Sequence, residues 1–190
     1  SPTEPLQLLS TDVIIIARSP TEPNASSDGH AYIHIIRDFY SGACFAYPLK
    51  QHTQDQIFDN LKHFAGPITG RPNIVVKSDE ERGVVKAVKD LGWHPHTSVA
   101  NLWPHNTHLE RFVQTYESVC RSAICQSGWP QKQWHFVSQY AAVAYNLTSP
   151  AYIMPTERDE DGNIKEGEPK AKQSAWQCFH KGDPFVGKRP

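Results

Sequence analysis

Apolar runs separated by polar turn residues divide the chain into alternating predicted strands and helices. Continuous β-branched runs and alternating apolar positions are typical of strands, whereas apolar residues at i, i+3, i+4 and i+7 are typical of helices. The predicted strands span residues 9–18, 31–39, 43–49, 73–77 and, more weakly, 93–99. The predicted helices span residues 53–65, 83–91, 109–124, 134–146 and 174–179.

This order, three strands followed by alternating helices and strands, predicts an α/β fold. We expect a five-stranded mixed sheet, with three antiparallel strands, then a βαβ arrangement, and helices on both faces. We assign residues 1–150 to a core domain and residues 151–190 to an insertion and a C-terminal tail of that core. The stretch 156–173 is charged and lacks aromatic residues, which indicates a mobile insertion.

Composition narrows the functional classes. The chain of 190 residues has 19 basic and 20 acidic residues and a formal net charge of −1, whereas free-standing nucleic-acid binders are often strongly basic. Any DNA contact must therefore come from local patches or from further parts of a longer protein, which the absence of an initial Met leads us to expect. Four Cys without paired spacing predict reduced, packed thiols in an intracellular protein. No apolar run approaches the roughly 20 residues of a membrane span.

Three separated acids carry the candidate chemistry. Asp12 lies in an apolar strand, Asp79 follows a buried strand, and Glu110 opens an amphipathic helix 31 positions later. An unpaired Asp is costly to bury within a strand, which makes Asp12 unusual. Binding and active sites of α/β sheets lie at the carboxyl ends of strands, where Asp79 stands. Their order and topology would bring the three carboxylates to one point of the sheet, where they could hold two divalent metal ions for phosphodiester chemistry.

Each acid also has a purely structural interpretation. Asp12 could cap a turn at a strand end, and Asp79 could begin an ordinary loop. The sequence Thr107-x-x-Glu110 fits a capping box, in which the glutamate only satisfies the N-terminus of its helix. The joint pattern of all three acids favours the metal site.

Short blocks around and beyond the acids carry a family resemblance. They are Leu9-Ser10-Thr11-Asp12, Lys77-Ser78-Asp79, the run from Pro104 to Arg111, Gly128-Trp129-Pro130 with Trp134 and Asn146, and the run from Ser174 to Gly182. Together they resemble the Asp-Asp-Glu catalytic core of retroviral and retrotransposon integrases, which has an RNase H-like fold. The last block is similar to that of Ty1/copia-type elements. The resemblance covers roughly residues 6–190.

The chain also departs from the family pattern. Glu80-Glu81-Arg82-Gly83-Val84 stands where the family usually has Asn-Gly-x-Glu-Phe. Thr107 replaces a Gly, and Gln114 stands where a basic residue often follows the glutamate by four positions. Glu80 and Glu81 could add affinity for a metal or could be surface residues, and we favour the surface interpretation.

The resemblance implies a metal-dependent polynucleotidyl transferase that processes DNA 3′ ends and joins them to target DNA. It implies that Asp12, Asp79 and Glu110 are the catalytic residues and hold two Mg²⁺ or Mn²⁺ ions, for which hard oxygen ligands are suited. It also implies element and target DNA as partners, a homodimer or larger assembly, no membrane, and action in the nucleus after a virus-like particle or cytoplasmic stage.

Four residues are candidate DNA contacts: Lys77, His105, Asn106 and Arg111. Asn106 could instead cap a turn, and the others could be ordinary surface residues.

Two other functions remain open. A decayed or domesticated integrase core could keep the fold as a DNA-binding or dimerisation module. Another RNase H-like nuclease would typically carry a fourth acid, for which Asp38, Asp55 and Asp59 are available.

Overall fold

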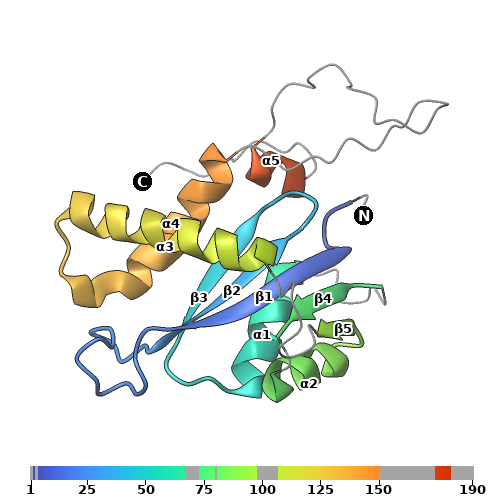
Figure 1. The fold of residues 1–190 in the computed structure, drawn as a ribbon, viewed down its shortest axis with the longest axis horizontal. Coiled ribbons are helices and arrows are strands. Elements are labelled where there is room, and N and C mark those ends of the chain that lie inside the picture. The colour runs from blue at the N-terminus through green and yellow to red at the C-terminus, as the bar shows by residue number, and fades with distance from the viewer. Residues whose placement is uncertain are drawn as a thin grey trace.

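The computed structural model describes residue 2 and residues 4–66, 73–79, 81–97, 107–149 and 174–180. Five strands form one mixed sheet with the spatial order β3-β2-β1-β4-β5 (Figure 1). The pairs β1–β2 and β2–β3 are antiparallel, and β1–β4 and β4–β5 are parallel. This confirms the predicted sheet. The strands are β1 Leu8–Ile15, β2 Tyr32–Asp38, β3 Cys44–Leu49, β4 Val75–Ser78 and β5 His94–Thr97.

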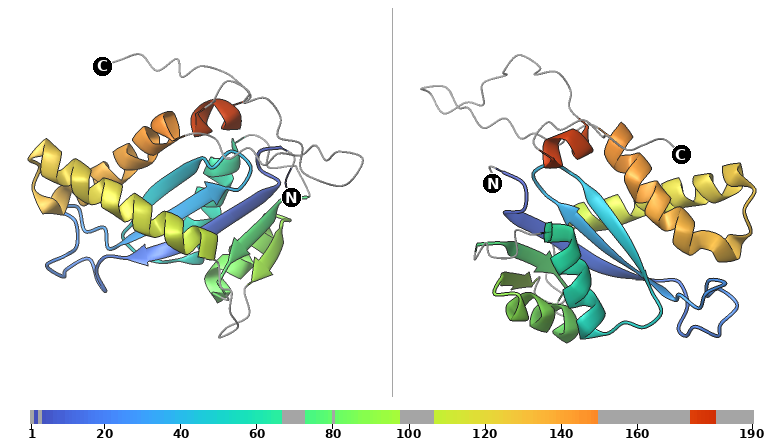
Figure 2. Two further views of the ribbon diagram at one scale, coloured as in Figure 1. Left: turned by 45° about the horizontal axis from the view of Figure 1, so that its top comes forward. Right: turned by 180° about the vertical axis from the view of Figure 1, so that it is seen from behind.

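Helices cover both faces of the sheet (Figure 2), as predicted. α1 (Gln54–Ala65) and α2 (Arg82–Asp90) contribute to a core that includes Leu9 and Val76 on one face. α3 (Thr107–Ser127) and α4 (Trp134–Thr148) contribute to a second core that includes Ile35 on the other face. A short 3-10 helix, Gln131–Gln133, precedes α4, and α5 spans Ala175–Phe179. Among the helices of the described ranges, none combines the length and apolar character needed to cross a membrane.

Local sequence explains where the helices begin and end. Thr53 accepts a hydrogen bond from the Gln56 N–H and is the N-cap of α1. α2 is followed by Gly92 at φ 74°, a conformation that residues with a side chain rarely adopt. Ser174 and Gln177 form a capping box at the start of α5.

Several boundaries differ from the sequence prediction. β1 ends at Ile15 because the next two backbone N–H groups, of Ile16 and Ala17, both donate to the Ala31 carbonyl, which stops the regular ladder. α3 extends beyond the predicted 109–124 at both ends. The predicted insertion at 156–173 and the last two positions of the predicted strand 93–99 lie outside the described residues.

The C-terminal elements close the open edge of the sheet. Asn146, at the end of α4, accepts from the Cys44 N–H at 2.8 Å and donates to the Cys44 carbonyl at 2.7 Å, so its amide pairs with the edge strand β3. The Phe179 ring of α5 lies 5.3 Å from the Phe64 ring. An edge strand paired in this way cannot recruit a foreign strand at that point.

Candidate active site

Asp12 lies in the central strand, on the face covered by α3 and α4. In β1, Leu9 belongs to the core beneath α1 and α2 and Ile14 to the core beneath α3 and α4, so alternation places Asp12 on the α3 side. The last register pair between β1 and β4 is Ser10 with Lys77. Continuing that parallel register brings Asp12 level with Asp79, one strand spacing away, which is about 4.8 Å.

The carboxyl of Asp12 is held in an unfavourable environment for its charged form. Burial in the sheet raises its pKa, while a 2.7 Å hydrogen bond from the Val13 N–H opposes that shift. The negative charges of Asp79 and Glu110 raise the pKa of Asp12 further. The structure therefore brings all three predicted acids close enough to act on one another.

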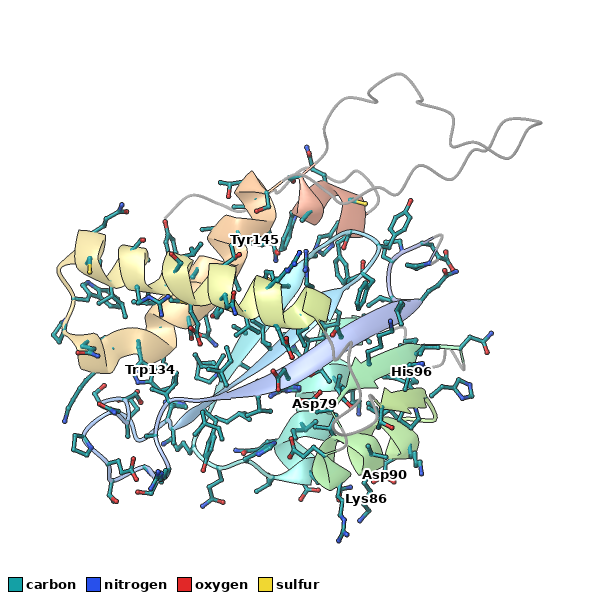
Figure 3. All side chains as sticks on the ribbon, viewed as in Figure 1. Asp79, Lys86, Asp90, His96, Trp134 and Tyr145 are labelled. Carbon is teal, nitrogen blue, oxygen red and sulfur yellow. The ribbon has the colours of Figure 1, made fainter. Side chains whose placement is uncertain are left out.

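Asp79 and Glu110 reach this point from different elements. Asp79 directly follows β4, is exposed, and lies between β1 and α2 in the view of Figure 3. Glu110 is exposed in the first turn of α3. The three carboxylates thus come from the interior of β1, the end of β4 and the first turn of α3, and they meet on the face of the sheet that α3 covers.

Two further residues belong to this site: the sequence did not single out His52, and it favoured a surface interpretation of Glu81. His52, just before α1, places Nε2 2.9 Å from Oε1 of Glu81, although the contact lacks hydrogen-bond geometry. Partial burial raises the pKa of Glu81, His52 opposes this shift, and the charges of Asp12 and Asp79 add to it. Glu81 is therefore a fourth carboxylate at the site and not a remote surface residue, whereas Glu80 lies outside the described residues.

Of the four candidate DNA contacts, two are described. Lys77 lies on the same face as Asp12 by strand alternation, and its Nζ is 5.2 Å from the centre of the Phe39 ring. Arg111 is exposed beside Glu110 on α3. His105 and Asn106 lie outside the described residues.

Asp38, which the sequence offered as a fourth acid, has a structural role. Its carboxylate accepts from the backbone N–H groups of Leu6 and Ser41 and from the Ser41 hydroxyl, at 2.7–2.8 Å. Asp55 and Asp59 are exposed on α1. Glu81 is the acid that joins the cluster.

The donor chemistry of the cluster fits hard divalent cations. Carboxylate oxygens are the protein ligands that Mg²⁺ prefers. A cation between several carboxylates also reduces the electrostatic repulsion among them. Asp12, Asp79 and Glu110 could hold such ions, and Glu81 lies near enough to contribute. Such an arrangement suits charge stabilisation at a phosphodiester.

No family model matches the chain, and no curated protein matches its sequence. Solved structures do share its fold. The integrase catalytic core domain of HTLV-2, determined with magnesium in a trimeric and a dimeric form, aligns at TM-score 0.58 in both, with 12% and 11% identity. Each alignment covers 95% of this chain, and 100% and 99% of the respective core-domain chains.

A chain of the simian T-cell lymphotropic virus intasome, in complex with the PP2A regulatory subunit B56 gamma, aligns over all of this chain at TM-score 0.63 and 14% identity. This chain spans 59% of the length of that one. The fold is that of an integrase catalytic core, an RNase H-like α/β fold.

Proposed function

We propose that this chain is the catalytic core of a retrovirus- or retrotransposon-type integrase, which processes DNA 3′ ends and joins them to target DNA. One observation carries the proposal: Asp12, Asp79 and Glu110, from three separate elements, converge so closely that their charges raise the pKa of Asp12. The shared fold supports the same reaction class. Assignment to a Ty1/copia-type element rests on the block around Ser174-Ala175-Trp176.

The three acids would hold the metal ions from three different elements. Asp12 lies in the central strand, where it pairs with Ile35 of β2, while Asp79 and Glu110 approach it from a strand end and a helix start. When bound, two Mg²⁺ or Mn²⁺ ions would activate the attacking oxygen and stabilise the leaving 3′-oxygen. That attacking oxygen belongs to water in 3′ processing and to a DNA 3′-hydroxyl in strand transfer.

The imidazole beside Glu81 has a positioning role in this proposal. His52 Nε2 lies 2.9 Å from Glu81 Oε1, and His52 lowers the pKa of both Glu81 and Asp12. It therefore favours the charged forms in which these two carboxylates would hold a cation.

DNA would be held by local basic residues, because the net charge of the whole chain is −1. We assign phosphate contacts to Lys77 and Arg111, and contacts near the reacting strand to His105 and Asn106. Element ends and target DNA are the proposed partners, and joining to a chromosome would take place in the nucleus.

A second copy of the chain is the proposed protein partner. The solvent-facing side of α4 carries an apolar stripe of Phe136, Tyr140, Val143 and Leu147, with exposed fractions of 48%, 66%, 38% and 38%. Their spacing places them along one side of the helix. Two such stripes could cover each other in a symmetric dimer, and the HTLV-2 core is recorded as a dimer and as a trimer.

A catalytically silent integrase core is the second candidate function, and two observations favour it. Glu81 adds a fourth negative charge to the site, and Gln114, exposed one turn beyond Glu110, cannot neutralise a phosphate. In that case the chain would serve as a DNA-binding or dimerisation module.

An activity assay separates the two candidates. Purified protein is given duplex substrates for 3′ processing and strand transfer, and a disintegration substrate, in Mn²⁺. Asp79→Asn should abolish every activity, while Asp59→Asn, which changes an exposed carboxylate on α1, should leave it intact. If no substrate is turned over and calorimetry detects no Mn²⁺ binding to the wild type, the integrase proposal fails and the silent module replaces it.

A further inference from the structure

A second cluster of metal-ligating side chains lies away from the carboxylates. Asp28 and His30 belong to the loop between β1 and β2, and His135 lies in the first turn of α4. One ligand atom from each lies within 4.8 Å of the others. In Figure 3, Trp134, the neighbour of His135, lies at the left of the molecule, whereas Asp79 lies near its centre. The proposed integrase reaction makes no use of these three residues.

His135 is the unusual member of this group. The residue is only 3% exposed, yet within the described part of the chain neither of its ring nitrogens has a hydrogen-bond partner. A buried polar group without a partner costs roughly 1–3 kcal/mol. Such a group in a native structure points to an occupant that the protein itself does not supply.

The spacing of the ligand atoms suits a tetrahedral ion. His135 Nε2 lies 3.2 Å from Asp28 Oδ2. Zinc bonds to imidazole nitrogen and carboxylate oxygen are about 2.0–2.2 Å, so two ligands of a tetrahedral site lie about 3.3–3.5 Å apart. The two atoms are therefore already close to the separation that a shared ion requires.

His30 lies beside His135 in an orientation that contacts with His135 and Ser26 fix. Its ring stacks on His135, with centroids 4.9 Å apart and planes 19° from parallel, and Ser26 Oγ lies 3.2 Å from its Nδ1. With the Nδ1 proton directed to Ser26, Nε2 carries a lone pair for a metal.

The loop that carries Asp28 and His30 is already fastened to the start of α4. The Ser27 N–H donates to the Lys132 carbonyl at 2.9 Å, and the Trp134 indole N–H donates to the Asn24 carbonyl at 3.1 Å. These bonds hold the three ligands near one another without an ion. A bound ion would complete the link between the β1–β2 loop and α4.

We propose that Asp28, His30 and His135 form a Zn²⁺ site that joins the β1–β2 loop to α4. Two imidazoles and one carboxylate favour Zn²⁺ over Mg²⁺, which prefers oxygen ligands alone. Three protein ligands leave a fourth position for water or for a group from a binding partner. The site is independent of the cluster of four carboxylates that includes Asp12.

The test uses the full chain after treatment with a chelator, with Zn²⁺ as the probe in calorimetry and thermal unfolding. We expect one ion per chain and a rise in Tm of about 5–10 °C when free Zn²⁺ is 100 times its Kd. His30→Gln and Asp28→Asn should lose this rise and fold normally, since neither side chain is fully buried. His96→Gln, which changes an exposed histidine on β5, should keep it.

Two controls identify the ligands. Cobalt in place of zinc should give a tetrahedral spectrum without a thiolate charge-transfer band, which excludes the exposed Cys125. Asp79→Asn should retain the Zn²⁺ effect while losing Mn²⁺-dependent turnover, so this site and the proposed integrase activity can fail separately. An absent Tm rise in the wild type, or an undiminished rise in both His30→Gln and Asp28→Asn, would overturn the proposal.

Discussion

The histidine at the centre of the sheet should make the stability of this protein depend steeply on pH. His34 in β2 is fully buried. Its Nε2 lies 2.6 Å from Thr11 Oγ1, whose hydroxyl donates to the Ile35 carbonyl at 3.0 Å. Thr11 must therefore accept from the Nε2–H of His34. The opposite nitrogen, Nδ1, accepts from the Asn60 amide at 3.2 Å. The neutral ring satisfies every one of these groups.

The sign and size of the effect follow from the pKa. Burial lowers the pKa of His34 from 6.5 to about 3, and the charge of His52 adds to the shift. A histidine whose folded pKa lies below its unfolded value contributes full stability above pH 6.5. It loses that contribution as the pH falls toward 3, because the unfolded chain binds the proton more readily. The loss is about 1.4 kcal/mol per pH unit, or about 2 kcal/mol between pH 7 and pH 5.

Urea unfolding at pH 7, 6 and 5, with a chelator present, measures this loss. His34→Gln should lower stability at pH 7 but flatten the pH dependence, so the wild type and the variant should converge by about 2 kcal/mol at pH 5. The raised pKa values of Asp12 and Asp38 act in the opposite direction, but in both proteins alike. His96→Gln should retain the wild-type slope. Parallel pH curves for the wild type and His34→Gln would refute the neutral buried imidazole.

Two further predictions concern α4. Asn146→Ala should lower the free energy of unfolding by about 2–4 kcal/mol in urea, because it leaves the buried N–H and carbonyl of Cys44 unpaired. A decrease below about 1 kcal/mol would show that other groups pair with that edge of the sheet. Tyr140→Lys should weaken self-association at least about tenfold in sedimentation equilibrium, because it places a charge in the apolar stripe. Ile15→Lys is the control: it changes a side chain on β1 that is also 66% exposed, and it should leave self-association unchanged. Equal weakening of self-association by Tyr140→Lys and Ile15→Lys would contradict a dimer through α4.

The sheet could be predicted from the sequence because each strand is indicated by residues that are adjacent in the chain. Continuous β-branched residues such as Val13 to Ile16 indicate a strand whatever surrounds them, although Ile15 is 66% exposed. The order of the elements then leaves few ways to connect them. The helix starts at Thr53 and Ser174 were visible for the same reason, since a cap depends on residues within one turn.

The contents of the two clusters could not be predicted in the same way. His52 and Glu81 are 29 positions apart, and each looks like an ordinary polar residue in its own segment. Asp28 and His135 are more than 100 positions apart and meet because the β1–β2 loop is hydrogen-bonded to the start of α4. Such contacts depend on tertiary packing. The three acids stood out because their order along the predicted elements would bring them to one point of the sheet.

Two buried aspartates of neighbouring strands show why the carboxylate cluster is better explained by function than by folding. Burial raises the pKa of both Asp38 and Asp12. Asp38 is surrounded by donors from the chain itself, so its charge is satisfied within the fold. Asp12 instead faces Asp79, Glu110 and Glu81, which repel it. A fold selected only for stability would not gather like charges around a half-buried carboxylate. A cation between them removes the repulsion, which is the condition under which this arrangement becomes favourable.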